Sequence, residues 1–197
     1  QFMAHGTTVV INALTERKGV KTALITTEGF RDSLEIARGN RPDFFNLYYS
    51  KPKPFTPRYL RREVPGRLSP KGEERRPLDL SGLPAIIDDF RTEGGEAIGI
   101  CLPHSYANPD HEVAVLERVR ELWPGVSVVA SHQIVREWRE YERSSTTVLS
   151  AYVQPLAERY LGRLEEGARK AGFGGQLYIT QSNCGIDTLS HAKEIPI

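Results

Sequence analysis

Short apolar runs alternate along the chain with stretches in which apolar residues recur at three- and four-residue spacings. Four of the apolar runs are rich in β-branched residues and end at glycine or polar residues, which is typical of buried strands. These strand candidates cover residues 20–26, 96–102, 126–130 and 177–180. The helical spacings indicate helices over residues 8–17, 30–38, 82–92 and 110–122. This alternation predicts a layered α/β fold.

The helix predicted over residues 110–122 has signals at both ends. Asn108 can cap its first turn, and the carboxylates of Asp110 and Glu112 complement the positive end of the helix dipole. Pro124 follows the pattern and cannot continue the helix. We therefore expect these boundaries to be well defined.

The longest helical pattern covers residues 142–170, and its apolar positions indicate one buried face. Pro155 lies inside this pattern, where its ring removes one backbone hydrogen bond and clashes one turn back. The sequence therefore predicts either a helix that bends at Pro155 or two helices that abut there.

Residues 42–84 differ in composition from the rest of the chain. Eight of the 13 prolines lie there, and residues 51–76 contain nine basic and three acidic side chains. Such a proline density predicts an excursion from the core in extended and turn conformations. A solvated loop, a lid and a contact with an acidic partner surface all fit this composition. RNA binding is disfavoured, because the aromatic residues there form no RNA-binding signature.

Composition narrows the class of protein. The 197 residues are 39% hydrophobic and carry a net charge of +1, which fits a globular domain and excludes a disordered chain or a general nucleic-acid binder.

Cys101 and Cys184 form no CxxC motif, so we expect a reducing compartment, the cytoplasm. We expect neither export nor membrane insertion, because we find no leader pattern and no apolar run of roughly 20 residues.

Three polar clusters could carry chemistry, and the first lies near the start of the chain. His5, Gly6, Thr7 and Thr8 stand directly before the predicted helix that contains Asn12. Hydroxyl groups and unpaired backbone N–H groups at such a helix start can bind an anion. An ordinary N-cap formed by either threonine explains the same residues.

The second cluster lies on the long helix, where four polar residues share one arc of about 100°. They are Arg143, Thr146, Thr147 and Ser150. A guanidinium group beside hydroxyl groups suits a phosphate or a carbonyl substrate. A solvated helix face is the alternative interpretation.

The third cluster, residues 181–185, follows the last predicted strand. Ser182 and Asn183 would lie at the carboxyl edge of a sheet, where open α/β sheets bind ligands, although a plain turn fits equally well. No base neighbours Cys184 in the sequence, so we expect a structural thiol and not a nucleophile.

Other familiar signatures are missing from the sequence. The GxSxG, HExxH, GxGxxG and GxxxxGK[ST] motifs do not occur. His104, Asp110, His111 and Glu112 are metal-ligand types, but their spacing matches no familiar zinc arrangement. We therefore expect no metal site of this chain's own.

Five separated segments resemble, in order and spacing, the hydantoinase A and 5-oxoprolinase family, which also includes acetone carboxylase subunits. The resemblance covers nearly the whole chain, and five matches in the right order are more specific than any one of them. The segments are HGTTVVINALTERKG (5–19), ALITTEGFRDSLEIAR (23–38), HSYANPDHE (104–112), EYERSSTTVLSAYVQP (140–155) and QSNCG (181–185).

The resemblance implies part of a ribonuclease-H-like fold of the actin, sugar-kinase and heat-shock ATPase superfamily, arranged around an ATP cleft. It also implies that MgATP phosphorylates the carbonyl oxygen of a lactam or cyclic imide before water opens the ring. Such phosphoryl transfer depends on positioning and on stabilising negative charge. By carry-over, Arg143, Thr146 and Asn183 would be catalytic. Substrate or phosphate binding would fall to His5, Gly6, Thr7, Thr8, Asn12 and Ser182.

Two positions depart from the family pattern, because relatives usually have Asn at Ser150 and Gly at Cys184. Substrate contacts at both positions therefore stay open.

The family's acidic, glycine-rich phosphate loop is expected before His5, and its Ser-Gly-Pro-Ala-Gly-Gly-like loop after Pro196. We expect residues 1–197 to be an N-terminal-region fragment of a longer subunit that alone binds ATP and Mg²⁺ weakly or not at all.

The resemblance predicts part of an ATP-dependent cyclic amide hydrolase of the hydantoin-utilization type, in a cytoplasmic hetero-oligomer with a hydantoinase B-like second subunit. An ATP-dependent carboxylase subunit of the acetone carboxylase type is the alternative within the family. A module without catalytic function, which docks a partner through the basic segment 51–76, is a third interpretation. A sugar or acetate kinase shares the superfamily, but residues 23–38 favour the hydantoinase group.

Overall fold

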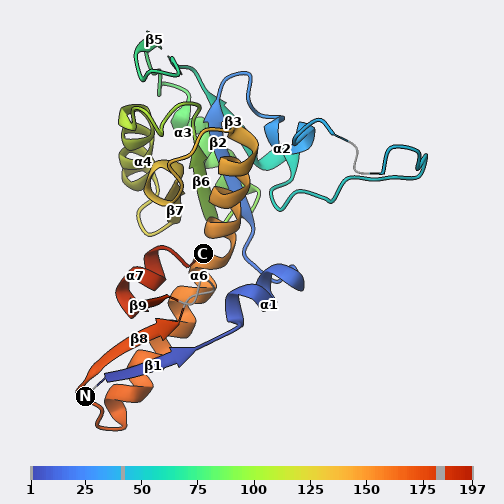
Figure 1. Cartoon of the computed structure of the whole chain (residues 1–197). Helices are drawn as coiled ribbons and strands as arrows, with labels where there is room; N and C mark the ends of the chain where they lie inside the picture. The colour runs from blue at the N-terminus through green and yellow to red at the C-terminus, as the bar shows by residue number, and fades with distance from the viewer. Residues whose placement is uncertain (1, 41–42, 181–184, 197) are drawn as a thin grey trace. The chain divides into compact units, whose positions relative to one another are not determined.

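The computed structural model describes residues 2–40, 43–180 and 185–196. The chain divides into two compact units. The terminal unit combines Gln1–Val20 with Leu149–Ile197, and the central unit consists of Lys21–Val148. The central unit is therefore inserted in sequence between the two halves of the terminal unit (Figure 1).

The central unit is built on a four-stranded parallel sheet with the order β3-β2-β6-β7. Its strands are β2 (Thr22–Thr27), β3 (Arg61–Val64), β6 (Ala97–Cys101) and β7 (Ser127–Ala130). All residues of β2 and β6 are buried, as expected for parallel strands that are covered on both faces. This double coverage explains why their sequences form continuous apolar runs.

Alternate residues of the central sheet pack into two different cores. On one face, Ile25 and Ile98 pack with helices α3 (Leu83–Thr92) and α4 (Asp110–Leu122). On the other face, Leu24 and Cys101 pack with Val148 from the start of helix α6 (Glu140–Lys170). Shorter elements complete the unit: α2 (Ser33–Ile36), a 3₁₀ turn η1 (Arg58–Leu60), the antiparallel pair β4 (Arg67–Leu68) and β5 (Glu74–Arg76), and α5 (Ser131–Ile134).

The terminal unit contains a three-stranded sheet with the order β1-β8-β9. Strands β1 (Phe2–Gly6) and β8 (Gln176–Thr180) are parallel, and β9 (Ile186–Thr188) is antiparallel to β8. Helices α1 (Val9–Thr15), α7 (Leu189–Glu194) and the part of α6 from Leu149 onward complete this unit. Leu161, Ile179 and Ala192 form a core cluster among these elements.

Gly19 allows the end of the Gln1–Val20 segment to pack closely against helix α6 within the terminal unit. A Cβ atom at Gly19 would lie 2.1 Å from a ring carbon of Tyr152. The next residue, Val20, donates its backbone N–H to the carbonyl oxygen of Tyr152 at 3.0 Å. Backbone and ring can approach this closely only because Gly19 has no side chain.

Most elements predicted from the hydrophobic pattern are confirmed. The four strand candidates correspond to β2, β6, β7 and β8, and α4 covers the predicted residues 110–122. The Asn108 side chain accepts a hydrogen bond from the backbone N–H of Asp110 at 2.9 Å. Pro155 lies inside the single helix α6, so the alternative of two abutting helices is wrong. The helix predicted over 30–38 is shorter, since α2 ends before Ala37, whose φ is 55°.

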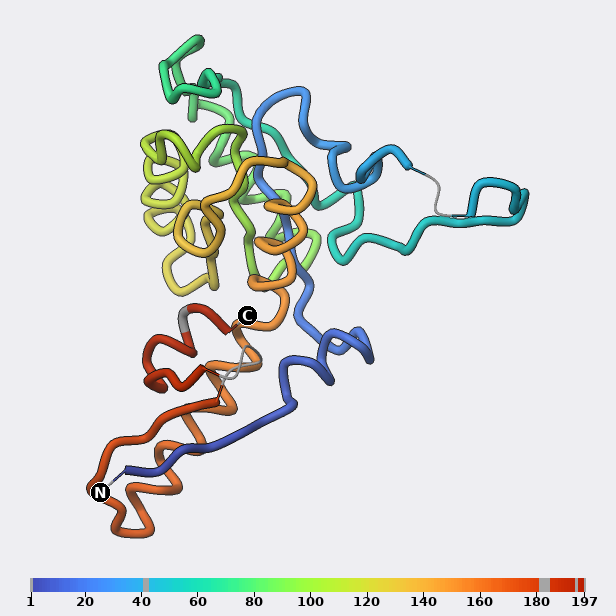
Figure 2. The backbone as a smooth tube through the Cα atoms, in the orientation of Figure 1, coloured from blue at the N-terminus to red at the C-terminus, as the bar shows by residue number. Residues whose placement is uncertain are grey.

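The expectation for residues 42–84 is wrong for one part of the segment. Residues 61–64 form β3, which pairs with β2 in the central sheet, and Leu60 and Val64 are buried in its core. Pro57 and Pro65 flank η1 and β3, where a missing backbone N–H breaks no sheet pairing. The described residues between α2 and η1 do form an excursion. There the chain runs away from the central sheet and then returns to β3 (Figure 2).

None of the helices within the described ranges has an apolar stretch long enough to cross a membrane.

Candidate functional site

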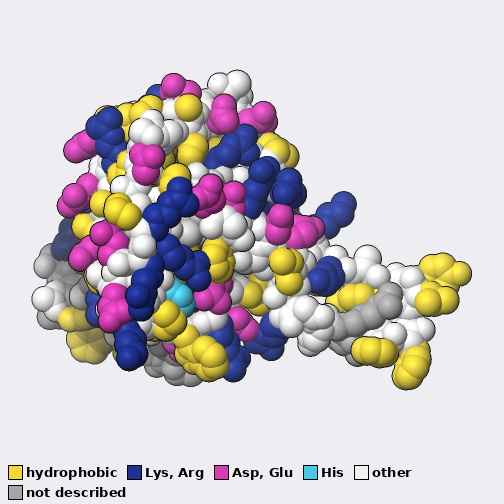
Figure 3. All heavy atoms as spheres, turned by 90° about the horizontal axis from the view of Figure 1, so that it is seen from above, with side chains coloured by type: hydrophobic (Ala, Val, Ile, Leu, Met, Phe, Trp, Pro, Cys, Tyr) yellow, Lys and Arg dark blue, Asp and Glu magenta, His cyan; other side chains and the backbone are white. Residues whose placement is uncertain are grey.

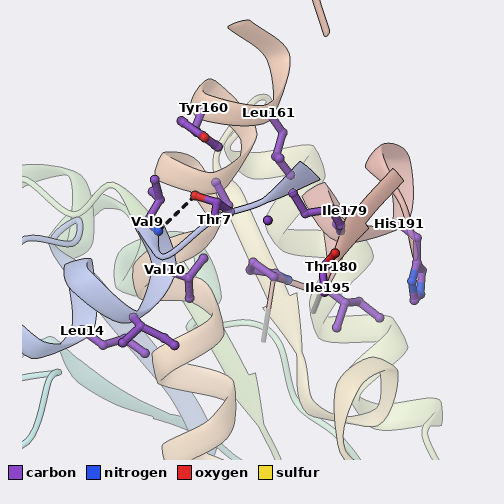
Figure 4. Close-up of a pocket in the computed structure, with 15 residues that line it drawn as sticks. Thr7, Val9, Val10, Leu14, Tyr160, Leu161, Ile179, Thr180, His191 and Ile195 are labelled. Carbon is purple, nitrogen blue, oxygen red and sulfur yellow. Dashed lines mark hydrogen bonds between the residues drawn. The ribbon is translucent and has the colours of Figure 1, made fainter. Parts of the chain in front are cut away.

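The terminal unit contains a cavity of about 590 Å³ beside the carboxyl ends of β1 and β8 (Figure 4). These two parallel strands are in register, so Gly6 is the ladder partner of Thr180. Thr7 continues from β1 into the cavity wall. Carboxyl ends of parallel strands are a common ligand position in α/β folds, and the volume falls in the usual range for small-molecule sites.

The walls of the cavity are largely apolar. Hydrophobic side chains from four places form these walls: Val10 and Leu14 of α1, Leu161 of α6, Ile179 of β8, and Ile195, which follows α7. Polar side chains among the described lining residues are Thr7, Tyr160, Thr180 and His191. This composition fits a small molecule with a hydrocarbon body and few polar atoms.

The Thr7 and Thr8 hydroxyl groups have local partners. Thr7 Oγ1 accepts a hydrogen bond from the Val9 backbone N–H at 3.2 Å, and this contact is drawn in Figure 4. Thr8 Oγ1 accepts one from Asn12 Nδ2 at 3.3 Å. Each hydroxyl can still donate its proton, because both printed contacts use it as an acceptor.

His5 is linked to the cavity through Tyr160. The Nε2 atom of His5 lies 2.7 Å from the hydroxyl oxygen of Tyr160, and the two ring centroids are 6.0 Å apart. Tyr160 lines the cavity, so His5 fixes the position of a wall residue that carries a hydroxyl group. The early histidine and the late helix residue are separated by 155 positions, and sequence reasoning did not identify Tyr160 as a site residue.

A second pair missed by the sequence analysis lies at the cavity edge. His191 Nδ1 forms a hydrogen-bonded ion pair with Asp187 Oδ2. The His191 side chain lowers the pKa of Asp187 below its ordinary value, chiefly through this hydrogen bond. The spacing of four residues is the sequence signal that could have indicated the pair.

In the central unit, the carboxylate of Glu112 is the centre of a buried polar network at the carboxyl ends of β6 and β7. Its Oε1 atom accepts hydrogen bonds from the Leu102 backbone N–H at 2.7 Å and from Ser131 Oγ at 2.6 Å. Its Oε2 atom accepts from the His132 backbone N–H and lies within hydrogen-bond distance of His132 Nδ1, both at 2.8 Å. The Glu112 side chain is completely buried.

Arg143 belongs to the same network, which we call the Glu112 network. Its Nη1 atom donates to the Leu102 carbonyl oxygen at 3.1 Å, and its Nη2 atom lies 3.5 Å from Glu112 Oε1 and also contacts Ser105 and Ser131. The Arg143 side chain is 1% exposed. Such a buried charge is tolerated because an opposite charge and several acceptors surround it.

The polar arc on α6 is therefore not a solvated face. Thr147 and Ser150 are fully buried, and Thr146 is half-buried. Thr147 Oγ1 donates to the Arg143 carbonyl oxygen at 2.8 Å, whereas Ser150 Oγ has no partner among the described residues. The catalytic role of Arg143 and Thr146 stays a prediction. Ser182, Asn183 and Cys184 lie outside the described residues, directly after the end of β8.

Among residues 2–40, 43–180 and 185–196, no cluster of three or more His, Cys, Asp or Glu side chains has metal-binding geometry. His104 and His111 have separate partners, since His104 Nδ1 is 3.2 Å from the Tyr106 hydroxyl and His111 Nε2 is 2.8 Å from Glu74 Oε1. Cys101 is buried, and burial raises the pKa of its thiol.

Comparison with known families gives two matches, which follow one another along the chain. The sequence profile of the hydantoinase/oxoprolinase N-terminal region matches residues 1–123. The profile of the hydantoinase/oxoprolinase domain matches residues 143–197. Together they account for most of both structural units.

Individual relatives agree with these profiles. Caprolactamase subunit alpha of Pseudomonas jessenii is 39% identical over 184 residues, which are 92% of this chain and 26% of that protein. The acetophenone carboxylase gamma subunit of Aromatoleum aromaticum is 32% identical over 197 residues, covering 93% of this chain and 27% of the relative. The chain thus spans about a quarter of the length of these curated relatives.

Solved structures show the same fold. The crystal structure of the ATP-dependent caprolactamase from Pseudomonas jessenii has a TM-score of 0.83 at 39% identity, over 92% of this chain and 26% of that chain. A nucleotide-free acetone carboxylase structure also has a TM-score of 0.83, at 26% identity, over 97% of this chain and 28% of that chain. These likenesses confirm the α/β fold class expected for this ATPase-like group.

Proposed function

The chain belongs to the hydantoinase/oxoprolinase family, and from this premise we propose that it is part of an ATP-dependent enzyme that opens cyclic amides. In the proposed reaction, phosphorylation of a lactam or imide carbonyl oxygen precedes hydrolysis of the ring. The cavity in the terminal unit holds the ring of the substrate. His5, Gly6, Thr7, Thr8, Asn12 and Ser182 serve substrate or phosphate binding, and Asn183 is catalytic.

The observation that carries this proposal is the position and lining of the cavity. The register of Gly6 with Thr180 aligns the carboxyl ends of β1 and β8, and Thr7 and Thr180 line the cavity there. The adjacent walls are apolar, with Val10, Leu161 and Ile179 among them. A lactam combines a hydrocarbon ring with one amide, and burial of its ring contributes about 25 cal/mol per Å² of apolar surface.

The hydroxyl group of Tyr160 is suited to polarise the substrate carbonyl. In the tautomer with the proton on Nε2, His5 donates to the Tyr160 oxygen at the observed 2.7 Å. The phenolic proton is then free to donate to a carbonyl oxygen in the cavity. A positioned donor of this kind stabilises negative charge that develops on the oxygen. Tyr160 is therefore our candidate for an electrophilic residue, and His5 is the residue that positions it.

The described cavity residues do not fit a magnesium-bound triphosphate. They offer two threonine hydroxyls, one phenol and one imidazole, but no Lys or Arg is among them. Among the described residues, the Asp187 carboxylate near the cavity edge is already paired with His191. We propose that the nucleotide is bound mainly by the remainder of the full-length protein.

The proposal includes a second subunit. Caprolactamase and acetophenone carboxylase relatives are named as subunits, which supports a hydantoinase B-like partner for this chain. We further propose a cytoplasmic hetero-oligomer, in agreement with the free cysteine at position 101.

A carboxylase subunit is the second candidate function. The likeness to acetone carboxylase over 97% of the chain favours it. In that case the cavity would hold a ketone, which also has a hydrocarbon body and one carbonyl oxygen. Both candidates use the same apolar walls and the same donor, so substrate turnover must separate them.

The deciding experiment measures phosphate release from ATP by the full-length protein together with its second subunit. The substrates are a series of lactams of increasing ring size, hydantoin, 5-oxoproline, and acetone or acetophenone with bicarbonate. Release that depends on a cyclic amide, with ring-opened product, supports the proposal. Release only with a ketone and bicarbonate would overturn it in favour of the carboxylase.

A further inference from the structure

An exposed aromatic loop lies between α2 and η1 of the central unit. Its four large apolar side chains are almost fully exposed: Phe44 by 74%, Phe45 by 93%, Leu47 by 86% and Tyr48 by 95%. Figure 3 shows hydrophobic side chains gathered at the end of a projecting arm. We call residues 43–49 the aromatic loop.

Local hydrogen bonds give the aromatic loop a turn structure. The Asn46 backbone N–H donates to the Asp43 carbonyl oxygen at 3.4 Å, and the Tyr49 N–H donates to the Asn46 carbonyl oxygen at 3.2 Å. The Asn46 side chain accepts a hydrogen bond from the Tyr48 N–H at 2.9 Å, which is an Asx turn. The turn uses the backbone and the Asn46 amide, and it leaves the apolar side chains directed outward.

The base of the loop is anchored to helix α2. Lys51 Nζ donates to the carbonyl oxygens of Ile36 at 2.8 Å and Glu35 at 3.2 Å. These carbonyl groups lie at the carboxyl end of α2, where a cation is favourable. The loop is therefore held at one end while its tip carries apolar area. Proteins rarely leave a cluster of large apolar side chains in water unless it binds something.

The chemistry of the tip favours a protein partner. Aromatic residues are enriched at the centres of protein interfaces, where they fill pockets of the partner. Lys51 and Lys53 follow the apolar tip in the sequence, whereas several arginines farther along pair with carboxylates of this chain. The surface complementary to the tip is therefore mainly an apolar groove. Asp43, at the start of the loop, makes an anionic membrane surface a poorer match.

We propose that the aromatic loop inserts into an apolar groove of the second, non-identical subunit of the enzyme. This inference rests on the proposed function, in which the chain works with such a subunit, and the names of the caprolactamase and acetophenone carboxylase relatives support that arrangement. Phe45 and Tyr48 are the anchors, because they have the largest exposed fractions of the four side chains.

The test uses the full-length protein and its separately purified second subunit. The variant is Phe45→Ser combined with Tyr48→Ser, and the matched control is Trp138→Ser, which removes another exposed aromatic side chain of the central unit. Affinity is measured by sedimentation velocity over a concentration series. We expect the double variant to bind the second subunit about 100-fold more weakly, since two interface anchors typically contribute this much. Trp138→Ser should stay within threefold of the unchanged protein.

Measurements of stability, vesicle binding, self-association and phosphate release make the result decisive. The thermal midpoint of the double variant should equal that of the unchanged protein, because both side chains are exposed. An affinity for the second subunit within threefold of the unchanged protein would overturn the proposal. So would a selective loss of vesicle binding or of self-association, because either result assigns the loop to a membrane or to a second copy. If cyclic amides drive phosphate release while the loop variant assembles normally, the docking inference fails and the proposed function stands.

Discussion

Gly6 and Thr180 are aligned partners in the parallel ladder of β1 and β8, although 174 positions separate them in the sequence. Their pairing places the carboxyl ends of β1 and β8 at one edge of the sheet. The apolar cavity lies at this edge, with Thr7 and Thr180 in its wall. The first polar cluster predicted from the sequence thus adjoins the cavity through the pairing of β1 with β8.

The Tyr160 hydroxyl is expected to act on the substrate carbonyl, so Tyr160→Phe should lower kcat about 10- to 100-fold in the full-length enzyme with its second subunit. KM should change less than about threefold, since the ring that forms the cavity wall remains. Steady-state kinetics with a lactam checks this. Tyr178→Phe, which removes a hydroxyl bonded to Gln176 outside the cavity lining, is the control and should leave kcat unchanged. Equal loss in both variants would contradict the role of Tyr160.

Arg143→Met is expected to destabilise the central unit by about 3–5 kcal/mol, because it leaves the buried Glu112 carboxylate without its cation. Arg143→Lys should recover only part of this, since an ammonium group cannot reproduce the forked contacts with Leu102, Ser105 and Ser131. Thermal and urea unfolding of the full-length protein measure the effect. Arg159→Met, on the exposed face of the same helix, is the control. A purely catalytic Arg143 would instead show normal unfolding with a reduced kcat.

Gly19→Ala is expected to lower stability by about 1–3 kcal/mol, because the new methyl group collides with the Tyr152 ring. Gly162→Ala is the matched control, since a Cβ atom there meets open space within helix α6. That second change should raise stability by about 0.5–1 kcal/mol through helix propensity. Thermal unfolding of both full-length variants provides the comparison, and a neutral Gly19→Ala would refute the close contact.

His104 should make the protein less stable as pH falls. Burial, with the nearby Arg67 charge second, lowers the pKa of His104, while Glu140 opposes this and Arg143 adds to it. In the unfolded chain, His104 takes up a proton near its ordinary pKa of about 6.5, whereas in the folded chain it stays neutral at that pH. The contribution of His104 to the free energy of unfolding is therefore fully present above about pH 6.5. It is lost as the pH falls toward the lower pKa of the folded state.

The variant His104→Asn checks this pH dependence. Asparagine tolerates the left-handed backbone at this position, where φ is 65°. Unfolding midpoints measured between pH 5 and pH 8 should fall less on acidification for the variant than for the unchanged protein. Parallel curves would show that His104 does not contribute.

The sequence by itself determined most of the secondary structure. Apolar runs located β2, β6, β7 and β8 because buried parallel strands need hydrophobic side chains on both faces. The carboxylates of Asp110 and Glu112 indicated the start of α4, because they act within its first turn. Asn108 accepts a hydrogen bond from the Asp110 N–H, but the N-cap residue is Pro109, so the expected Asn108 cap is wrong. The short strand β1 was missed, since most of its residues are exposed and it becomes a strand through pairing with β8.

Only the tertiary structure decided what the polar residues do. The arc of Arg143 and Thr147 has the same helical pattern whether it meets water or a buried acceptor, and Glu112 and Ser131 on other elements settle that it is buried. Tyr160 likewise lines the cavity and meets His5 only because the fold brings together two residues that are 155 positions apart in the sequence. The periodicity of a sequence shows which face of a helix or strand is apolar. Which polar groups pair across long sequence distances depends on the tertiary structure.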